Sequence, residues 1–228
     1  MPERCFCEAV SAGVVRQPAN SLSSGAFLIV AIAALWQARD ARRVDARRVN
    51  GGINGGIGGR AATRFAAAVT LVGLGSAFFH ASLTFWGQTA DVLGMYLVAT
   101  FLLLESMARK TRWSARQHDA LFWGGNAALL TVLVAVPELR RYLFALLVGA
   151  ILWSEWRNLQ LPDAGGSARP LMAAVGVLAA GFAVWVLDLT RVVCAPESPW
   201  QGHALWHLCG AASTWLAYRA IVRPLRAA

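Results

Sequence analysis

The chain has 228 residues, of which 57% are hydrophobic and only 14% are charged. A soluble domain has about a quarter charged residues, so this deficit indicates an integral membrane protein. The net charge of +9 does not indicate nucleic-acid binding, because the basic residues lie in gaps between apolar runs rather than along one helical face. Loops on the cytoplasmic side of a membrane collect Lys and Arg in this way.

Seven apolar stretches are long enough to cross a bilayer as helices, since a span needs about 20 mostly apolar residues. The first begins near Leu22 and is interpreted as a retained span, because the N-terminus lacks the apolar region of a cleavable signal peptide. The sequence therefore predicts a single all-α domain over residues 1–228, a bundle of seven transmembrane helices. The predicted spans are residues 20–38, 61–80, 88–107, 118–136, 140–157, 169–188 and 201–222.

The basic residues also predict the orientation of the bundle. Most of the 21 Lys and Arg residues follow the first, third and fifth spans or lie at the C-terminal end. Because cytoplasmic loops carry this excess, we expect the N-terminus outside and the C-terminus in the cytoplasm. An odd number of spans agrees with that orientation.

Polar residues interrupt the apolar runs in two places. Ser76 and His80 are four residues apart at the end of the second span, and Asp91 follows at the start of the third. His203 and His207, also four apart, open the seventh span. Residues four apart share one face of a helix, and the predicted topology brings all five to the outer leaflet. Because ionisable groups at membrane depth are costly, they indicate a functional site.

These residue types fit a catalytic zinc site. His203 and His207 have the spacing of two zinc ligands on one helix, and His80 could supply a third nitrogen. Three protein ligands leave the fourth position for a water molecule, whose pKa zinc lowers to about 7. Asp91 is suited to orient that water and move its proton, and Ser76 to donate a hydrogen bond to a developing oxyanion. The pattern predicts a metal hydrolase that cleaves an acyl bond in a lipid.

Each of these residues also has a simpler structural interpretation. A lone membrane histidine usually makes a helix–helix hydrogen bond, and a lone serine often bonds back to its own helix. Asp91 needs a partner, which could be the metal site or the N–H groups of a helix end that it caps. Two histidines four apart, with a third at the same depth, favour the metal site. His118 lies at the cytoplasmic start of the fourth span beside Asp119 and is interpreted as a solvated interfacial residue.

The segments that carry these residues resemble the motifs of a known family. They are Gly75-Ser-Ala-Phe-Phe-His-Ala-Ser-Leu83, Gln88-Thr-Ala-Asp91 and Gly202-His-Ala-Leu-Trp-His207. The resemblance is to the alkaline ceramidases, part of a superfamily of seven-span hydrolases that also includes the progestin/adiponectin receptors. It implies zinc on His80, His203 and His207, with Asp91 and Ser76 as catalytic partners. It also implies hydrolysis of ceramide to a sphingoid base and a fatty acid.

The resemblance extends to three further residues. It implies a disulfide between Cys7 and Cys194, which would suit a periplasmic or luminal compartment. It also implies a supporting or substrate-contacting role for Asp188 at the outer end of the sixth span.

One segment departs from the family pattern. Eukaryotic members have an acid-rich N-terminal calcium site before a Glu-Phe-Trp-Asn-Thr run. The corresponding run here is Gln17-Pro-Ala-Asn-Ser21, and only Glu3 and Glu8 before it are acidic. Since calcium needs 6–8 oxygen ligands, we expect the calcium site to be absent or weakened.

The leading hypothesis is a zinc-dependent intramembrane amidase that hydrolyses ceramide or a similar lipid amide. Its partners would be a lipid substrate and the bilayer, with no nucleic acid. Short, Arg-rich loops fit a small bacterial member, with its site at the periplasmic face of the inner membrane. The alternatives are a receptor-like seven-span protein with a structural or weakly hydrolytic zinc, or a hydrolase of another acyl lipid. Intact ceramidase-type motifs, without the large N-terminal domain of the receptors, favour the enzyme.

Overall fold

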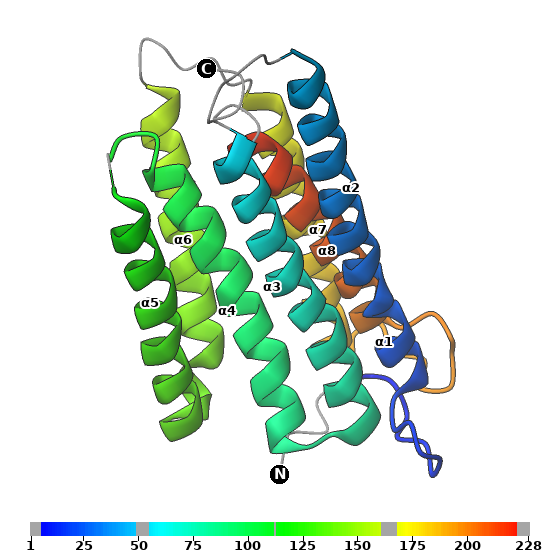
Figure 1. Cartoon of the computed structure of the whole chain (residues 1–228). Coiled ribbons are helices and arrows are strands. Elements are labelled where there is room, and N and C mark those ends of the chain that lie inside the picture. The colour runs from blue at the N-terminus through cyan, green and yellow to red at the C-terminus, as the bar shows by residue number, and fades with distance from the viewer. Residues whose placement is uncertain (1–5, 49–54, 112, 161–167, 223–228) are drawn as a thin grey trace.

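The computed structural model describes residues 6–48, 55–111, 113–160 and 168–222, which are helical or irregular and contain no strand. The long helices α2 to α8 lie side by side in one bundle (Figure 1). The helices are α1 (Pro18–Ser23), α2 (Gly25–Arg48), α3 (Gly55–Ser82), α4 (Phe85–Met107), α5 (Ala115–Ala135), the 3-10 turn η1 (Pro137–Leu139), α6 (Arg140–Leu159), α7 (Ala168–Leu189) and α8 (Gly202–Ile221).

Each apolar stretch predicted to be a span is helical, but the helices differ in how well they suit a membrane. Among the described residues, α5 and α6 are long and apolar enough to cross a membrane only when taken as a pair. The pair is bent by 118° where the two helices meet, and it would add a fifth span if counted as one broken span. These helices are compatible with a multi-pass integral membrane protein. Four segments qualify individually by length and composition: Pro18–Arg39, Ala61–Ser82, Phe85–Met107 and Ala168–Leu189.

Helices α3 and α4 pack closely because glycines line their contact. A Cβ atom added at Gly75 would lie 2.7 Å from the carbonyl carbon of Ala90, and one added at Gly94 would lie 2.6 Å from the backbone of α3. A larger side chain at either position would push the helices apart, as small residues allow membrane helices to approach. The contact brings the end of α3, with His80, beside the start of α4, with Asp91.

A buried ionic cluster joins three helices at the opposite end of the bundle. Arg109, in the turn that follows α4, pairs with Glu155 of α6, with 3.2 Å between Nη1 and Oε2. The Ser106 hydroxyl donates to the other Glu155 oxygen at 2.6 Å. Arg109 Nη2 also donates to the carbonyl oxygens of Ala220 and Ile221, at 3.1 and 2.8 Å, where α8 ends. One guanidinium therefore connects α4 to both α6 and α8.

We expect Glu155→Ala to destabilise the fold by about 3 to 5 kcal/mol, because it leaves the Arg109 charge without its buried partner. Unfolding in detergent, followed by circular dichroism, measures this loss. The matched control is Glu138→Ala, since Glu138 is exposed, and its expected change is below about 0.5 kcal/mol. Equal stability of the two variants would contradict a structural role for the ionic cluster.

Candidate metal centre

Three histidines meet at the end of the bundle that carries the N-terminal segment, which comprises residues 6–17. His80 lies in the last turn of α3, and His203 and His207 lie in the first two turns of α8. Their side chains are buried, with exposed fractions of 0, 5 and 4%. One ring nitrogen from each lies within 4.8 Å of the others. The Nε2 atoms of His80 and His203 are only 3.1 Å apart.

Hydrogen bonds at the outer side of two rings determine which nitrogen faces this centre. The Ser23 hydroxyl donates to the Asn20 carbonyl at 3.0 Å and lies 2.8 Å from His207 Nδ1. Since its proton is used on Asn20, Ser23 accepts from a protonated Nδ1, and His207 Nε2 keeps a lone pair. On His80, Nδ1 lies 2.8 Å from Gln17 Oε1, an acceptor, so Nε2 again keeps its lone pair.

This donor set fits a metal ion such as zinc. Neutral imidazoles bind zinc through a lone pair on one nitrogen, while the other nitrogen donates to an oxygen. His80 and His207 both have this arrangement. His203 Nδ1 is buried without a hydrogen-bond partner among the described residues, and the Phe6 ring covers the imidazole with 3.8 Å between ring centroids. The three residues could therefore hold a metal ion with one coordination position left for another ligand.

The serine and the aspartate predicted from the sequence lie beside the histidines. Ser76 is buried one turn before His80 on α3, and its hydroxyl is 3.4 Å from His207 Nε2. The Asp91 carboxyl interacts with the Ser76 hydroxyl and is half-buried. A hydroxyl and a carboxyl therefore lie on the α3–α4 side of the three imidazoles, where the absence of a side chain at Gly75 lets the helices meet.

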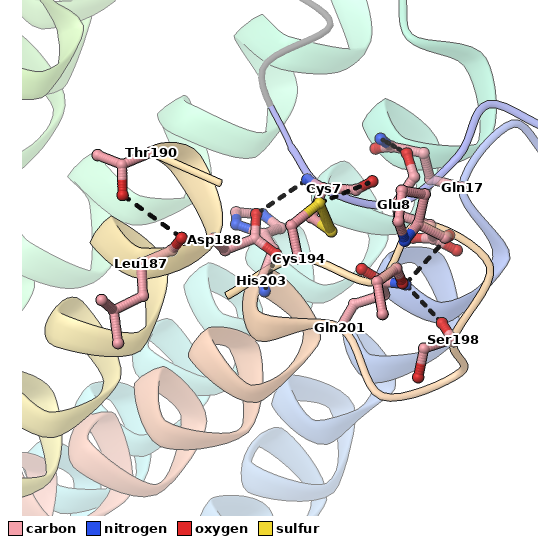
Figure 2. Close-up of a disulfide and its surroundings, with 12 residues drawn as sticks. Cys7, Glu8, Gln17, Leu187, Asp188, Thr190, Cys194, Ser198, Gln201 and His203 are labelled. Carbon is pink, nitrogen blue, oxygen red and sulfur yellow. Dashed lines mark hydrogen bonds between the residues drawn. A yellow bond between two sulfur atoms is a disulfide. The ribbon is translucent and has the colours of Figure 1, made fainter. Parts of the chain in front are cut away.

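Asp188, at the end of α7, supports the first turn of α8. One carboxylate oxygen accepts from the backbone N–H of His203 at 3.2 Å, and the other from the backbone N–H of Cys7 at 3.1 Å (Figure 2). Gly202 makes this contact possible, because a Cβ atom there would lie 2.9 Å from the Asp188 Cβ. The carboxylate stabilises the N-terminal end of α8, where backbone N–H groups lack helical partners.

A disulfide holds the N-terminal segment against this end of the bundle. It joins Cys7 to Cys194 in the segment between α7 and α8, with 5.5 Å between their Cα atoms (Figure 2). This confirms the pairing implied by the family resemblance. Beside it, the backbone N–H of Ala9 donates to the carbonyl of Pro196 at 3.0 Å. The disulfide therefore connects the segment to the loop that leads into His203.

Glu8 holds the same segment against α1. Its carboxylate accepts from the backbone N–H groups of Ala19 and Asn20, at 2.7 and 3.0 Å. Burial raises the pKa of this carboxyl above its ordinary value, and the two N–H donors oppose the shift because they stabilise the charged form. Both oxygens of Glu8, one of the two acidic residues before the Gln17-Pro-Ala-Asn-Ser21 run, are thus hydrogen-bonded to the backbone.

The fourth histidine lies away from the centre, but it is not solvated as predicted. His118 is half-buried near the start of α5. Arg64 of α3 donates to its Nδ1 at 3.0 Å, and the Glu105 carboxylate of α4 lies 3.5 Å from its Nε2. Arg64 also pairs with Asp119. The prediction was wrong because both partners of the ring come from other helices.

The sequence pattern did not predict the residues that contact the three imidazoles. Gln17 contacts His80, Ser23 contacts His207, and Phe6 covers His203. In the sequence, Gln17 stands out only as the first residue of the run that departs from the family's calcium site. The available signal was the group of three serines, Ser21, Ser23 and Ser24, at the start of an apolar span.

Fold and site together define an all-α protein with a buried three-histidine centre, flanked by a serine and an aspartate. The family model described as Ceramidase matches residues 6–226, so the chain belongs to the ceramidase family. Comparison with curated proteins gives no match. Family membership confirms the resemblance found in the sequence and implies a hydrolase that acts on an amide bond.

We expect a non-reduced tryptic digest to contain peptide 5–16 linked to peptide 192–219, because Cys7 and Cys194 are covalently joined. Mass spectrometry before and after reduction detects the link. Each peptide contains a second cysteine, Cys5 or Cys209, so the matched variants decide the pairing. Cys5→Ser and Cys209→Ser should keep the link and Cys7→Ser should abolish it. Persistence in Cys7→Ser would contradict the pairing.

Proposed function

We propose that the chain is a zinc-dependent membrane amidase that hydrolyses ceramide, or a ceramide-like lipid amide, to a sphingoid base and a fatty acid. The observation that carries the proposal is the convergence of three buried imidazole nitrogens beside Ser76 and Asp91 in a member of the ceramidase family. His80, His203 and His207 would hold the metal, and Asp91 and Ser76 would act on the substrate.

The role of each residue follows from its chemistry. A bound zinc ion would supply Lewis-acid polarisation of the amide carbonyl and activation of water. The Asp91 carboxylate accepts a proton from the attacking water as the new carbon–oxygen bond forms. It then delivers that proton to the amide nitrogen as the carbon–nitrogen bond breaks, so the amine leaves neutral. The Ser76 hydroxyl donates a hydrogen bond to the carbonyl oxygen as negative charge develops there.

The proposal includes a seven-span topology with the site near the outer face. Helices α2 to α8 each have at least 20 residues, which at 1.5 Å per residue matches a hydrocarbon core of about 30 Å. The basic residues support an external N-terminus and a cytoplasmic C-terminus. The Cys7–Cys194 disulfide suits an oxidising compartment on the side of the site, such as a periplasm.

We expect the purified protein to bind about one zinc ion per chain and His203→Ala to lose it, because two nitrogens hold zinc far more weakly than three. Elemental analysis after gel filtration measures the zinc content. His118→Ala is the matched control, since this ring lies outside the centre, and should retain the metal. Zinc retained by His203→Ala would remove His203 from the ligand set.

We expect the wild-type protein to release fatty acid from ceramide in detergent micelles, and Asp91→Asn to lower turnover about 10²- to 10⁴-fold, since an amide cannot accept the proton. A panel of ceramides, N-acyl amino acids and lyso-lipids, assayed by mass spectrometry of the released acid, tests the substrate class. Asp91→Asn should keep its zinc, and Asp119→Asn, at the other end of the bundle, should keep full activity. Release only from the other lipids would contradict the ceramide assignment.

A further inference from the structure

Gln17 is attached to His80 through both its backbone and its side chain. Its backbone N–H donates to the carbonyl of His80 at 3.0 Å, and its side-chain Oε1 lies 2.8 Å from His80 Nδ1. The side chain is almost completely buried, with 2% of its surface exposed. A buried amide at hydrogen-bonding distance from a ring nitrogen influences which of the two ring nitrogens carries the proton.

The other atom of the amide identifies which end faces the imidazole. Gln17 Nε2 lies 3.4 Å from the carbonyl oxygen of Glu8, to which only the NH₂ end can donate. The oxygen therefore faces His80, and His80 Nδ1 carries the proton that the oxygen accepts. The His80 Nε2 lone pair then faces His203 Nε2, 3.1 Å away at the centre.

The N-terminal segment does not need this side-chain contact to stay in place. Arg16 donates through its backbone N–H to the carbonyl of Ala81 at 3.0 Å, beside the backbone bond from Gln17 to His80. The Cys7–Cys194 disulfide holds the other end of the segment. The backbone bonds and the disulfide therefore hold the segment in place without the bond between Gln17 Oε1 and the imidazole. Loss of that bond would change the protonation and orientation of the His80 ring more than the position of the segment.

We propose that Gln17 is a positioning residue that keeps His80 protonated on Nδ1 and directs His80 Nε2 toward the metal. The metal part rests on the proposed function, whereas the hydrogen bond to His80 does not. Outer hydrogen-bond partners of metal-binding histidines typically contribute 10- to 100-fold to metal affinity. Gln17 would supply that contribution from a segment separated from His80 by 63 positions in the sequence.

Three variants separate this role from a structural one. Gln17→Met keeps the size of the side chain and removes both the acceptor for His80 and the donor to the Glu8 carbonyl. Gln17→Glu restores an acceptor oxygen but not the donor, so recovery in this variant isolates the contact with His80. Gln201→Met is the matched control, because Gln201 is equally buried and donates to the carbonyls of Ala195, Pro196 and Ser198 in the same region. Among the described residues its side chain makes no hydrogen bond to a histidine.

Competition with a chelator measures zinc affinity in the full-length protein. We expect Gln17→Met to bind zinc about 10- to 100-fold more weakly, Gln17→Glu to recover most of the affinity, and Gln201→Met to remain near wild type. Wild-type affinity in Gln17→Met would overturn the inference. A loss of equal size in Gln201→Met would also overturn it, because the effect would then come from the region as a whole.

A second readout does not depend on zinc. The chain has four histidines, so ¹⁵N-histidine labelling gives few side-chain signals, and His80→Ala identifies the one from His80. We expect a downfield His80 Nδ1–H signal that is lost in Gln17→Met and kept in Gln201→Met. An unchanged signal in Gln17→Met would overturn the inference, whereas wild-type protein that binds no zinc would contradict the proposed function instead.

Discussion

Hydrogen bonds to two buried imidazoles, those of His80 and His207, are the interactions on which the arrangement of the three-histidine centre depends. A buried polar atom left without a hydrogen bond costs about 1 to 3 kcal/mol. Gln17 and Ser23 accept from the Nδ1 atoms of His80 and His207, and both lie in the N-terminal part of the chain. Their bonds leave the Nε2 lone pairs facing inward. The packing of the N-terminal part of the chain therefore determines which nitrogens of His80 and His207 face the centre.

Close backbone approach determines which groups can reach that centre. Gly75 allows α3 to meet α4 next to Asp91, and Gly202 allows α8 to meet the Asp188 carboxylate at the end of α7. At these two positions a glycine lets the neighbouring segments touch directly. These contacts position the helices that carry His80, Asp91 and His203. Residues on packed helices are held more precisely than residues on loops, so the three imidazoles, Ser76 and Asp91 are held in a defined arrangement.

The two ends of the bundle are stabilised by different means. At the end with the site, a disulfide and hydrogen bonds join the N-terminal segment to α3 and to the loop before α8. At the other end, Arg109 connects α4 to Glu155 of α6 and to the last carbonyls of α8. Removing either partner of a buried ion pair is costly, so this pair joins the helices firmly at the end of the bundle opposite the three histidines. At the histidine end the carboxylates of Glu8 and Asp188 bind backbone N–H groups, whereas at the other end the Glu155 carboxylate pairs with a guanidinium.

The sequence was sufficient to predict the helices and the grouping of Ser76, His80, Asp91, His203 and His207 at one end of the bundle. It could do so because apolar length marks a helix, spacing of four residues marks one helical face, and alternating direction assigns each helix end to a side. The partners of His80, His203 and His207 were decided only by the tertiary structure. The contacts join residues that are far apart in the sequence: Gln17 is 63 positions from His80, Ser23 is 184 from His207, and Phe6 is 197 from His203. The same holds for His118, whose partner Arg64 is 54 positions away. Local periodicity carries no information about such contacts, because they depend on how distant segments pack.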